Sequence, residues 1–213
     1  MKFLLAISLI GLALAGHSAE EWKSRNIYQL LTDRFARNDG NTGGCSNLGN
    51  YCGGGFVGLM NNLDYIQNMG FDAIWISPIV KNTPGGYHGY WAEDFYGINS
   101  HFGTEQDFVN LITEMHKRDM WVIVDVVANH IGPIGTSLDK VGEINPFNQK
   151  SYYHSYCSIN WSNQWSIENC WLADLPDLDQ SNDFVRKGLL DWISNLVTKY
   201  NVDGLRIDTC EEV

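Results

Sequence analysis

Short apolar runs of strand length recur along the chain. Four of them, rich in leucine, β-branched and aromatic residues, span residues 27–35, 73–77, 121–127 and 202–208. Runs of this kind are typical of strands that are buried on both faces, as they are in parallel sheets. The pattern therefore predicts four strands, and Pro78 closes the second of them.

Apolar residues at helical spacing fill the intervals between these runs. The first helical block spans residues 59–69, and the third spans residues 185–200 after a cap at Ser181 or Asn182. Thr104 opens the second block, with an acidic residue three positions later in the pattern of a capping box. The glycine-containing stretch before Thr104 is expected to be one long loop.

Residues 129–180 show neither strand-length apolar runs nor apolar residues at helical spacing. Gly, Pro, Asn, Ser and aromatic residues dominate a stretch that is far longer than an ordinary connection, so we interpret it as an inserted subdomain. The four strands and their crossover helices predict a parallel sheet, either doubly wound or closed into a barrel. Because a (β/α)8 barrel needs eight strands, the barrel interpretation gives this chain about half of one.

Composition narrows the class of partner. The chain has 213 residues, of which 44% are hydrophobic and 13% aromatic, which is enough for a real core. A net charge of −11 repels nucleic acids and anionic lipids. With only 18% charged residues but eight Trp and ten Tyr, the chain suits a neutral polar substrate such as a sugar.

The N-terminus predicts secretion. Lys2 precedes the apolar run 3–15, which ends in the small residues of a signal-peptide cleavage site. The alternative, a membrane anchor, is disfavoured because the run is shorter than the roughly 20 residues that span a bilayer. The rest of the sequence contains no stretch of about 20 apolar residues, so we expect a soluble mature protein without a membrane partner.

Cysteines in a secreted chain indicate disulfides rather than metal thiolates. Cys45 and Cys52 share a glycine-rich loop, Cys157 and Cys170 bracket an aromatic segment, and Cys210 stands alone. We expect two local bridges and one free thiol, although the spacing alone leaves other pairings open.

Polar residues follow the third and fourth predicted strands, where ligands meet parallel sheets. Asp125, Asn129 and His130 belong to the third strand and its end, and Arg206 and Asp208 to the fourth. Because Arg206 and Asp208 are two positions apart, they point to one face. An arginine keeps a neighbouring carboxylate ionised, and such a carboxylate can act as a nucleophile. The alternative is an ordinary ion pair.

Five segments in order resemble signature regions of the α-amylase family of glycoside hydrolases, especially the secreted fungal type. They are Ile27-Tyr-Gln-Leu-Leu-Thr-Asp-Arg-Phe35, Tyr87-His-Gly-Tyr-Trp91, Asp125-Val-Val-Ala-Asn-His130, Leu175-Pro-Asp-Leu-Asp179 and Gly204-Leu-Arg-Ile-Asp208. The resemblance implies an α/β fold, the N-terminal half of a TIM (β/α)8 barrel (strands 1 to 4) with the irregular subdomain inserted after strand 3. The implied parts are a signal peptide at 1–15, barrel segments at 16–128 and 181–213, and a calcium-associated subdomain at 129–180.

The resemblance also implies site residues. Asp208 matches the nucleophile of a retaining mechanism, and Arg206 matches the arginine that keeps it charged. Asp125 is expected to orient Arg206. The substrate contacts would be His88, Tyr90, Trp91 and His130. For Trp91, plain core packing is the alternative.

A structural Ca²⁺ is implied as well. Asn129 and Asp177 match side-chain ligands, and Glu168 and Glu212 match positions whose backbone carbonyls contribute. The alternative is a solvated acidic loop without an ion. The resemblance further implies bridges between Cys45 and Cys52 and between Cys157 and Cys170.

The implied function is that of a secreted, endo-acting α-amylase, monomeric at full length, which hydrolyses α-1,4 bonds of starch, glycogen and maltooligosaccharides. Glucan transferases, maltogenic amylases and α-glucosidases share these motifs. A doubly wound nucleotide-binding protein is a weak alternative, because Gly53-Gly-Gly55 lacks the required Gly-x-Gly-x-x-Gly turn. We expect that glycine run to be a flexible surface turn.

Two departures limit the resemblance. The family's general acid is a Glu on the fifth strand, and its transition-state-stabilising Asp lies on the seventh, whereas this sequence ends at Val213. We therefore expect a fragment that is inactive alone; the alternative is a short product that at most binds glucan. Glu211 and Glu212 also stand where fungal-type relatives have Lys and His, which contact the leaving-group sugars. We therefore expect the specificity of that subsite to differ from the fungal type.

Overall fold

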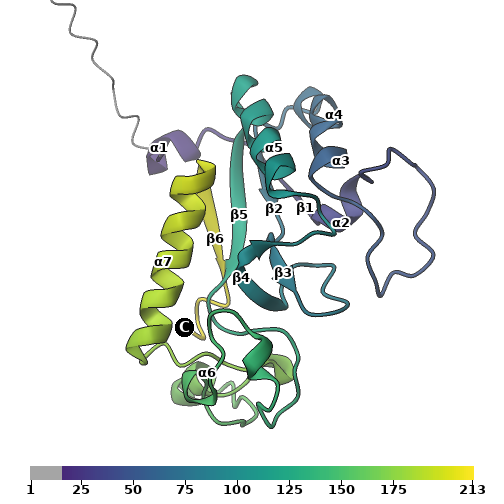
Figure 1. Ribbon diagram of the computed structural model, residues 1–213. Helices are drawn as coiled ribbons and strands as arrows, with labels where there is room; N and C mark the ends of the chain where they lie inside the picture. Colours follow the sequence, from purple (N-terminus) through teal and green to yellow (C-terminus); the bar gives the residue numbers. More distant parts are fainter. Residues whose placement is uncertain (1–15) are drawn as a thin grey trace, which may run out of the picture.

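The computed structural model describes residues 16–213, so the predicted signal peptide lies outside the described residues (Figure 1). One parallel sheet contains strands β1 (Ile27–Leu30), β2 (Ala73–Ile76), β5 (Trp121–Val127) and β6 (Gly204–Asp208), in that spatial order. Each strand thus neighbours the next strand of the sheet in sequence. A doubly wound sheet reverses its strand order at a switch point, whereas a barrel winds in one direction. The order therefore supports the predicted half-barrel.

Crossover helices pack on the outer face of this sheet. Helix α5 (Glu105–Lys117) begins at the predicted capping box, in which the Thr104 side chain accepts from the Asp107 amide. Helix α7 (Asp183–Tyr200) begins at Asn182 and lies alongside β6 in Figure 1. The core between sheet and helices is built from Ile74, Ile76, Val122, Val124, Val126, Phe108, Leu111, Ile112, Met115, Val185, Leu189, Trp192 and Leu196.

The opposite face of the sheet carries the side chains of interest. Along β2 and β5, Trp75 and Ile123 are partly exposed while their sequence neighbours are buried. The register pairs Asp125 of β5 directly with Arg206 of β6. Because side chains of paired residues in parallel strands share a face, the sheet itself brings these two charges together.

Two predicted boundaries are wrong at the start of the domain. The first strand ends at Leu30, and helix α2 (Thr32–Phe35) follows, because the Thr32 amide turns to donate to the Ser77 hydroxyl at 3.1 Å. The first predicted helix is divided into α3 (Phe56–Met60) and α4 (Leu63–Asn68). The preceding short helix α1 (Ala19–Trp22) was not predicted.

Other elements also differ from expectation. The stretch predicted to be a loop before Thr104 contains an antiparallel hairpin, β3 (Val80–Asn82) with β4 (Ala92–Ile98), whose register is irregular. The glycine run is not a flexible surface turn, since Gly54 and Gly55 are buried. A Cβ on Gly54 would lie 2.3 Å from the Asp33 carbonyl oxygen, so close backbone packing requires glycine there.

The segment 129–180 contains little regular structure. Short helices interrupt it: η1 (Val141–Glu143), η2 (Lys150–Tyr152), α6 (Gln164–Asn169) and η3 (Leu172–Asp174). A disulfide joins Cys157 to Cys170, and isolated bridges pair His130 with Asp177 and Tyr153 with Leu178. In Figure 1 the segment gathers at the carboxyl ends of β5 and β6.

The other expected disulfide, between Cys45 and Cys52, is also present, and Cys210 is exposed and unbridged. Both local bridges are therefore confirmed. Within residues 16–213, no helix has the length and apolar character needed to cross a membrane.

Candidate active site

The end of β6 places a carboxylate and a guanidinium together. Arg206 Nη1 donates to Asp208 Oδ1, and it also lies 3.1 and 3.2 Å from the two carboxylate oxygens of Asp125. The Asp125 side chain is fully buried, while that of Asp208 is 17% exposed. One arginine thus bridges a buried carboxylate and an accessible one. The accessible carboxylate is the one that can meet a substrate.

Asp125 is held by two further donors. The Tyr90 hydroxyl donates to Asp125 Oδ2 at 2.9 Å, and the Trp75 indole donates to the same oxygen at 3.0 Å. Burial raises the pKa of Asp125, and the bonds from Tyr90 and Arg206 oppose that rise. Burial and the nearby Asp125 charge raise the pKa of Tyr90, so its hydroxyl remains a donor. Trp75 is not among the site residues predicted from sequence, although its place in a strand with a period of two indicates that it faces inward.

The loop between β3 and β4 supplies a histidine beside this network. His88 Nδ1 accepts a hydrogen bond from the Tyr90 amide at 3.1 Å, and its ring lies edge-on to Trp91 at 4.7 Å. Burial lowers the pKa of His88, and the nearby Arg34 charge lowers it further. A neutral His88 whose Nδ1 accepts carries its proton on Nε2, which is then a donor.

His130 follows β5 and is buried at 3% exposure. Burial lowers its pKa to about 4, although the charge of Asp208 acts in the opposite direction. His130 is therefore neutral near pH 7. The fold brings Asp208, Arg206, Tyr90 and both histidines to one end of the sheet, and Trp91 packs against His88 beside them.

Oxygen atoms converge next to His130. The Asn129 amide lies 3.0 Å from Asp177 Oδ1 and 3.0 Å from the Glu212 carbonyl oxygen. In one amide orientation the NH₂ group donates to both oxygens. In the other, Asn129 Oδ1 joins them in a cluster of three oxygens, and its Nδ2 lies 3.3 Å from His130 Nδ1. The second arrangement is the one a hard cation selects.

The donor set fits such a cation. Asp177 is fully buried, and within residues 16–213 it forms no ion pair with a Lys or Arg; its only charged-pair neighbour is His154. Burial raises the pKa of Asp177 to about 6, as expected for a carboxylate that lacks water. The described residues hold no metal-competent group of three His, Cys, Asp or Glu side chains, and this site instead combines an amide, a carboxylate and a carbonyl.

The remaining expected ligand is the backbone carbonyl of Glu168. Glu168 is on helix α6, where its exposed carboxylate accepts from Gln164 Nε2 at 2.8 Å. Gln164 lies 3.5 Å from the Glu211 carbonyl, so α6 does reach the chain that follows β6.

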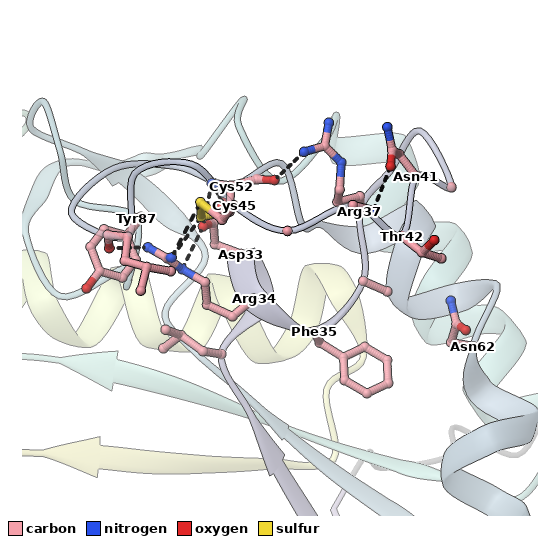
Figure 2. A pocket seen from close by; sticks show the side chains of 16 residues that line it. Asp33, Arg34, Phe35, Arg37, Asn41, Thr42, Cys45, Cys52, Asn62 and Tyr87 are labelled. Atoms are coloured by element: carbon pink, nitrogen blue, oxygen red, sulfur yellow. Dashed lines mark hydrogen bonds and ion pairs between the residues drawn. A yellow bond between two sulfur atoms is a disulfide. The ribbon is translucent and has the colours of Figure 1, made fainter.

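A cavity of about 830 Å³ is lined by residues of α2, by the loop with the Cys45–Cys52 bridge and by Tyr87 (Figure 2). Arg34 extends from α2 to stack on the Tyr87 ring at 3.9 Å and to donate to Cys52 Sγ. None of the residues around Asp208 lines this cavity. The charge of Arg34 is paired with Asp33 and that of Arg37 with Asp39, although Arg34 Nε forms no hydrogen bond. Arg34 tethers the loop that carries His88.

Comparisons with known proteins agree with this geometry. The catalytic domain of the α-amylase family matches residues 29–213. An "Alpha-amylase 2" of Schwanniomyces occidentalis is 46% identical over 100% of this chain and 48% of its own. The solved α-amylase of Malbranchea cinnamomea is 49% identical with a TM-score of 0.88, over 91% of this chain and 44% of its own. The α-amylase of Geobacillus thermoleovorans, solved with acarbose, is 42% identical with a TM-score of 0.80, over 90% and 41%. The chain thus spans less than half the length of these relatives.

Proposed function

The chain belongs to the α-amylase family, and from that premise we propose that it forms the nucleophile-bearing part of a secreted, endo-acting α-amylase that hydrolyses α-1,4-glucosidic bonds with retention of configuration. The observation that carries the proposal is the continuous network from Trp75 and Tyr90 through Asp125 and Arg206 to Asp208. This network leaves one carboxylate, that of Asp208, accessible where the strands end.

In this proposal Asp208 attacks the anomeric carbon of a glucosyl unit while the glycosidic C–O bond breaks, and a general acid protonates the leaving oxygen. The resulting covalent ester is then cleaved by water, which the same group activates as a general base. Arg206 forms an ion pair with Asp208, and Asp125 fixes Arg206 from behind. His88 and His130, both neutral, offer N–H donors to sugar hydroxyls. Since Asp125 occupies the Tyr90 hydroxyl, the Tyr90 ring face is the part that a sugar can stack on.

Retention requires a second carboxyl group, roughly 5 to 5.5 Å from the nucleophile, that acts as general acid and base. Asp125 cannot serve, because it is buried and its oxygens are occupied by Arg206, Tyr90 and Trp75. We therefore propose that the general acid is not among the described residues of this chain, which spans less than half the length of its relatives, and that these 213 residues alone have no useful hydrolytic activity.

We assign a Ca²⁺ ion to Asn129, Asp177 and the Glu212 carbonyl, with the Glu168 carbonyl as a fourth position from the family pattern. When bound, the ion supplies positive charge that offsets the buried Asp177 carboxylate. Asn129 and Asp177 lie at the two ends of the segment 129–180, and Glu212 follows β6. Binding would therefore fasten this segment to the strand that carries Asp208 and stabilise the folded state.

Secretion is part of the proposal. Two disulfides favour an oxidising compartment, and residues 1–15 carry the signal-peptide pattern. The proposed division places barrel segments at 16–128 and 181–213, and the inserted subdomain at 129–180. The proposed partner is an α-glucan.

A chimera tests the function. Residues 16–213 would replace the matching part of the Malbranchea cinnamomea α-amylase, which supplies the remaining strands. We expect release of reducing ends from maltoheptaose, with the α-anomer appearing first by NMR. Asp208→Asn should lower the rate by roughly 10⁴-fold, as loss of a nucleophile does. Asp191→Asn, an equal change on exposed α7, should leave the rate unchanged. Full activity of the Asp208→Asn chimera would exclude Asp208 as the nucleophile.

The second candidate function is a non-hydrolysing glucan binder, favoured by the single accessible catalytic carboxylate among the described residues. Isothermal titration of the 213-residue chain with maltoheptaose distinguishes the two. Binding heat without new reducing ends supports glucan recognition by this half of the site. Absence of heat would restrict function to the completed barrel.

A further inference from the structure

His154 belongs to the irregular segment, and the sequence motifs do not include it. Its Nδ1 lies 2.6 Å from Asp177 Oδ2, and its backbone amide donates to the Asp177 carbonyl at 3.1 Å. Its own carbonyl accepts from the Trp171 indole at 3.0 Å. The histidine is thus fixed against Asp177 by both its backbone and its ring.

The two oxygens of Asp177 have different partners. Oδ2 is in contact with His154 Nδ1, whereas Oδ1 faces the Asn129 amide, which in turn faces the Glu212 carbonyl. A carboxylate accepts hydrogen bonds only, so the ring nitrogen at 2.6 Å is the donor. That bond fixes the plane of the carboxylate and leaves Oδ1 free of protein donors when Asn129 presents its own oxygen.

We propose that His154 is a positioning residue for the cation site: its Nδ1–H holds the Asp177 carboxylate so that Oδ1 faces a bound Ca²⁺. The inference rests on the Ca²⁺ site proposed above, but not on hydrolysis. Donors behind a metal ligand orient it, and losing one typically weakens metal binding 10- to 100-fold.

The other ring nitrogen gives a means to separate roles. His154 Nε2 lies 3.5 Å from Asp179 Oδ1, which is too long for a strong bond. An asparagine side chain places its NH₂ near the Nδ1 position, whereas a glutamine places it near Nε2. The two substitutions therefore retain one contact each.

Ca²⁺ affinity would be measured by isothermal titration of the chelator-treated 213-residue chain with CaCl₂, and melting temperature in Ca²⁺ and in EGTA. We expect His154→Ala to weaken binding by roughly 10- to 100-fold and to remove most of the Ca²⁺-dependent rise in melting temperature. His154→Asn should stay within about threefold of the parent chain, and His154→Gln should resemble His154→Ala. His101→Ala, on a histidine that stacks on Tyr51 far along the chain from this site, is the control.

Parent-like affinity in His154→Ala, or equal losses in His154→Asn and His154→Ala, would overturn the proposal. If His154→Ala does not fold, the Asn and Gln variants decide between the same outcomes. A parent chain that binds no Ca²⁺ also overturns it. Because the readout is Ca²⁺ binding, an inactive chimera with intact Ca²⁺ affinity would reject the proposed hydrolysis and leave the role of His154 standing.

Discussion

The sheet and the segment 129–180 position their charged residues in different ways. In the sheet, Asp125 and Arg206 meet because backbone register pairs their positions on neighbouring strands. In the segment, Asp177 meets Asn129 and His154 through isolated bridges and side-chain bonds, with a disulfide nearby. The first arrangement depends on hydrogen-bonded strands, and the second depends on individual cross-links.

This difference teaches where each part is vulnerable. A ladder of parallel bonds is cooperative, so a change in one side chain of the sheet is felt through the whole domain. Segments with few backbone bonds open locally at lower cost. We therefore expect changes in the sheet to lower global stability, and changes in the segment to act on that segment first.

The largest effect is expected for Asp125→Ala. The substitution leaves the Arg206 guanidinium, the Tyr90 hydroxyl and the Trp75 indole without their shared acceptor. Removing one partner of a buried pair costs about 3 to 5 kcal/mol, and the lower end applies because the Arg206 side chain is 37% exposed. Urea unfolding of the chain measures the change. Asp139→Ala breaks an exposed pair with Lys150 in the segment and should cost less than about 1 kcal/mol. Equal losses would contradict the comparison.

Removing the bridge between Cys157 and Cys170 should have the next largest effect. The cysteines are 13 positions apart, so the Cys157→Ser, Cys170→Ser chain should lose at most about 3 kcal/mol. Amide hydrogen exchange would show which region loses stability. Amides of the segment 129–180 should lose protection, while those of β5 and β6 should keep it. The matched control is the Cys45→Ser, Cys52→Ser chain. Equal loss of protection in the sheet would show that the two regions unfold as one unit.

The same difference explains what the sequence could predict. The bounds predicted for β5 are correct, and the spacing of Arg206 and Asp208 placed both on one face, because a strand's period of two is a local property. The capping box of α5 was also predictable, since its two residues are three positions apart. Local patterns fixed these features without knowledge of the fold.

Contacts between residues far apart in the sequence could not be derived from the local pattern of apolar and polar residues. Asn129 and Glu212 converge only because β5 and β6 are neighbours, and the family resemblance, rather than spacing, linked them. His154 meets Asp177 through an irregular chain that has no period to analyse. The hairpin β3–β4 was missed because β3 has only three residues and the register between the two strands is irregular. In the irregular regions, position is a property of the tertiary structure.

Helix caps test the comparison on a smaller scale. Thr104 caps α5, which packs on the sheet, and Asn163 caps α6 within the segment, where its side chain accepts from the Ser166 amide. Replacing either cap with Ala removes the side-chain oxygen that accepts from a helix amide, and the loss of such a cap typically costs about 1 kcal/mol. Thr104→Ala should lower the global unfolding free energy by that amount. Asn163→Ala should increase amide hydrogen exchange in α6 and should lower the global unfolding free energy by less than Thr104→Ala does. A larger loss of global unfolding free energy for Asn163→Ala than for Thr104→Ala would contradict the local opening expected for the segment.

The smallest effect concerns the amino ends of β5 and β6, opposite the candidate site. His116 Nε2 lies 2.9 Å from Asp203 Oδ2, which also accepts from the Val122 amide. The bond to Asp203 raises the pKa of His116, and desolvation opposes the rise. A raised folded-state pKa means that the stabilisation is complete below the unfolded value of about 6.5 and is lost as pH rises through the folded value.

His116→Gln should therefore cost more stability at pH 5.5 than at pH 9, by less than about 1 kcal/mol because the histidine side chain is 28% exposed. Urea unfolding at both pH values measures the difference, with His101→Gln as the control. A difference that is constant with pH would mean that the imidazolium adds nothing. Asp203 would then be held at the sheet by its bond from Val122 and its contact with His17, at 3.2 Å from Nε2. In that case the charge of His116 would have no part in positioning the amino ends of these strands, whereas backbone register pairs Asp125 with Arg206 at the other end.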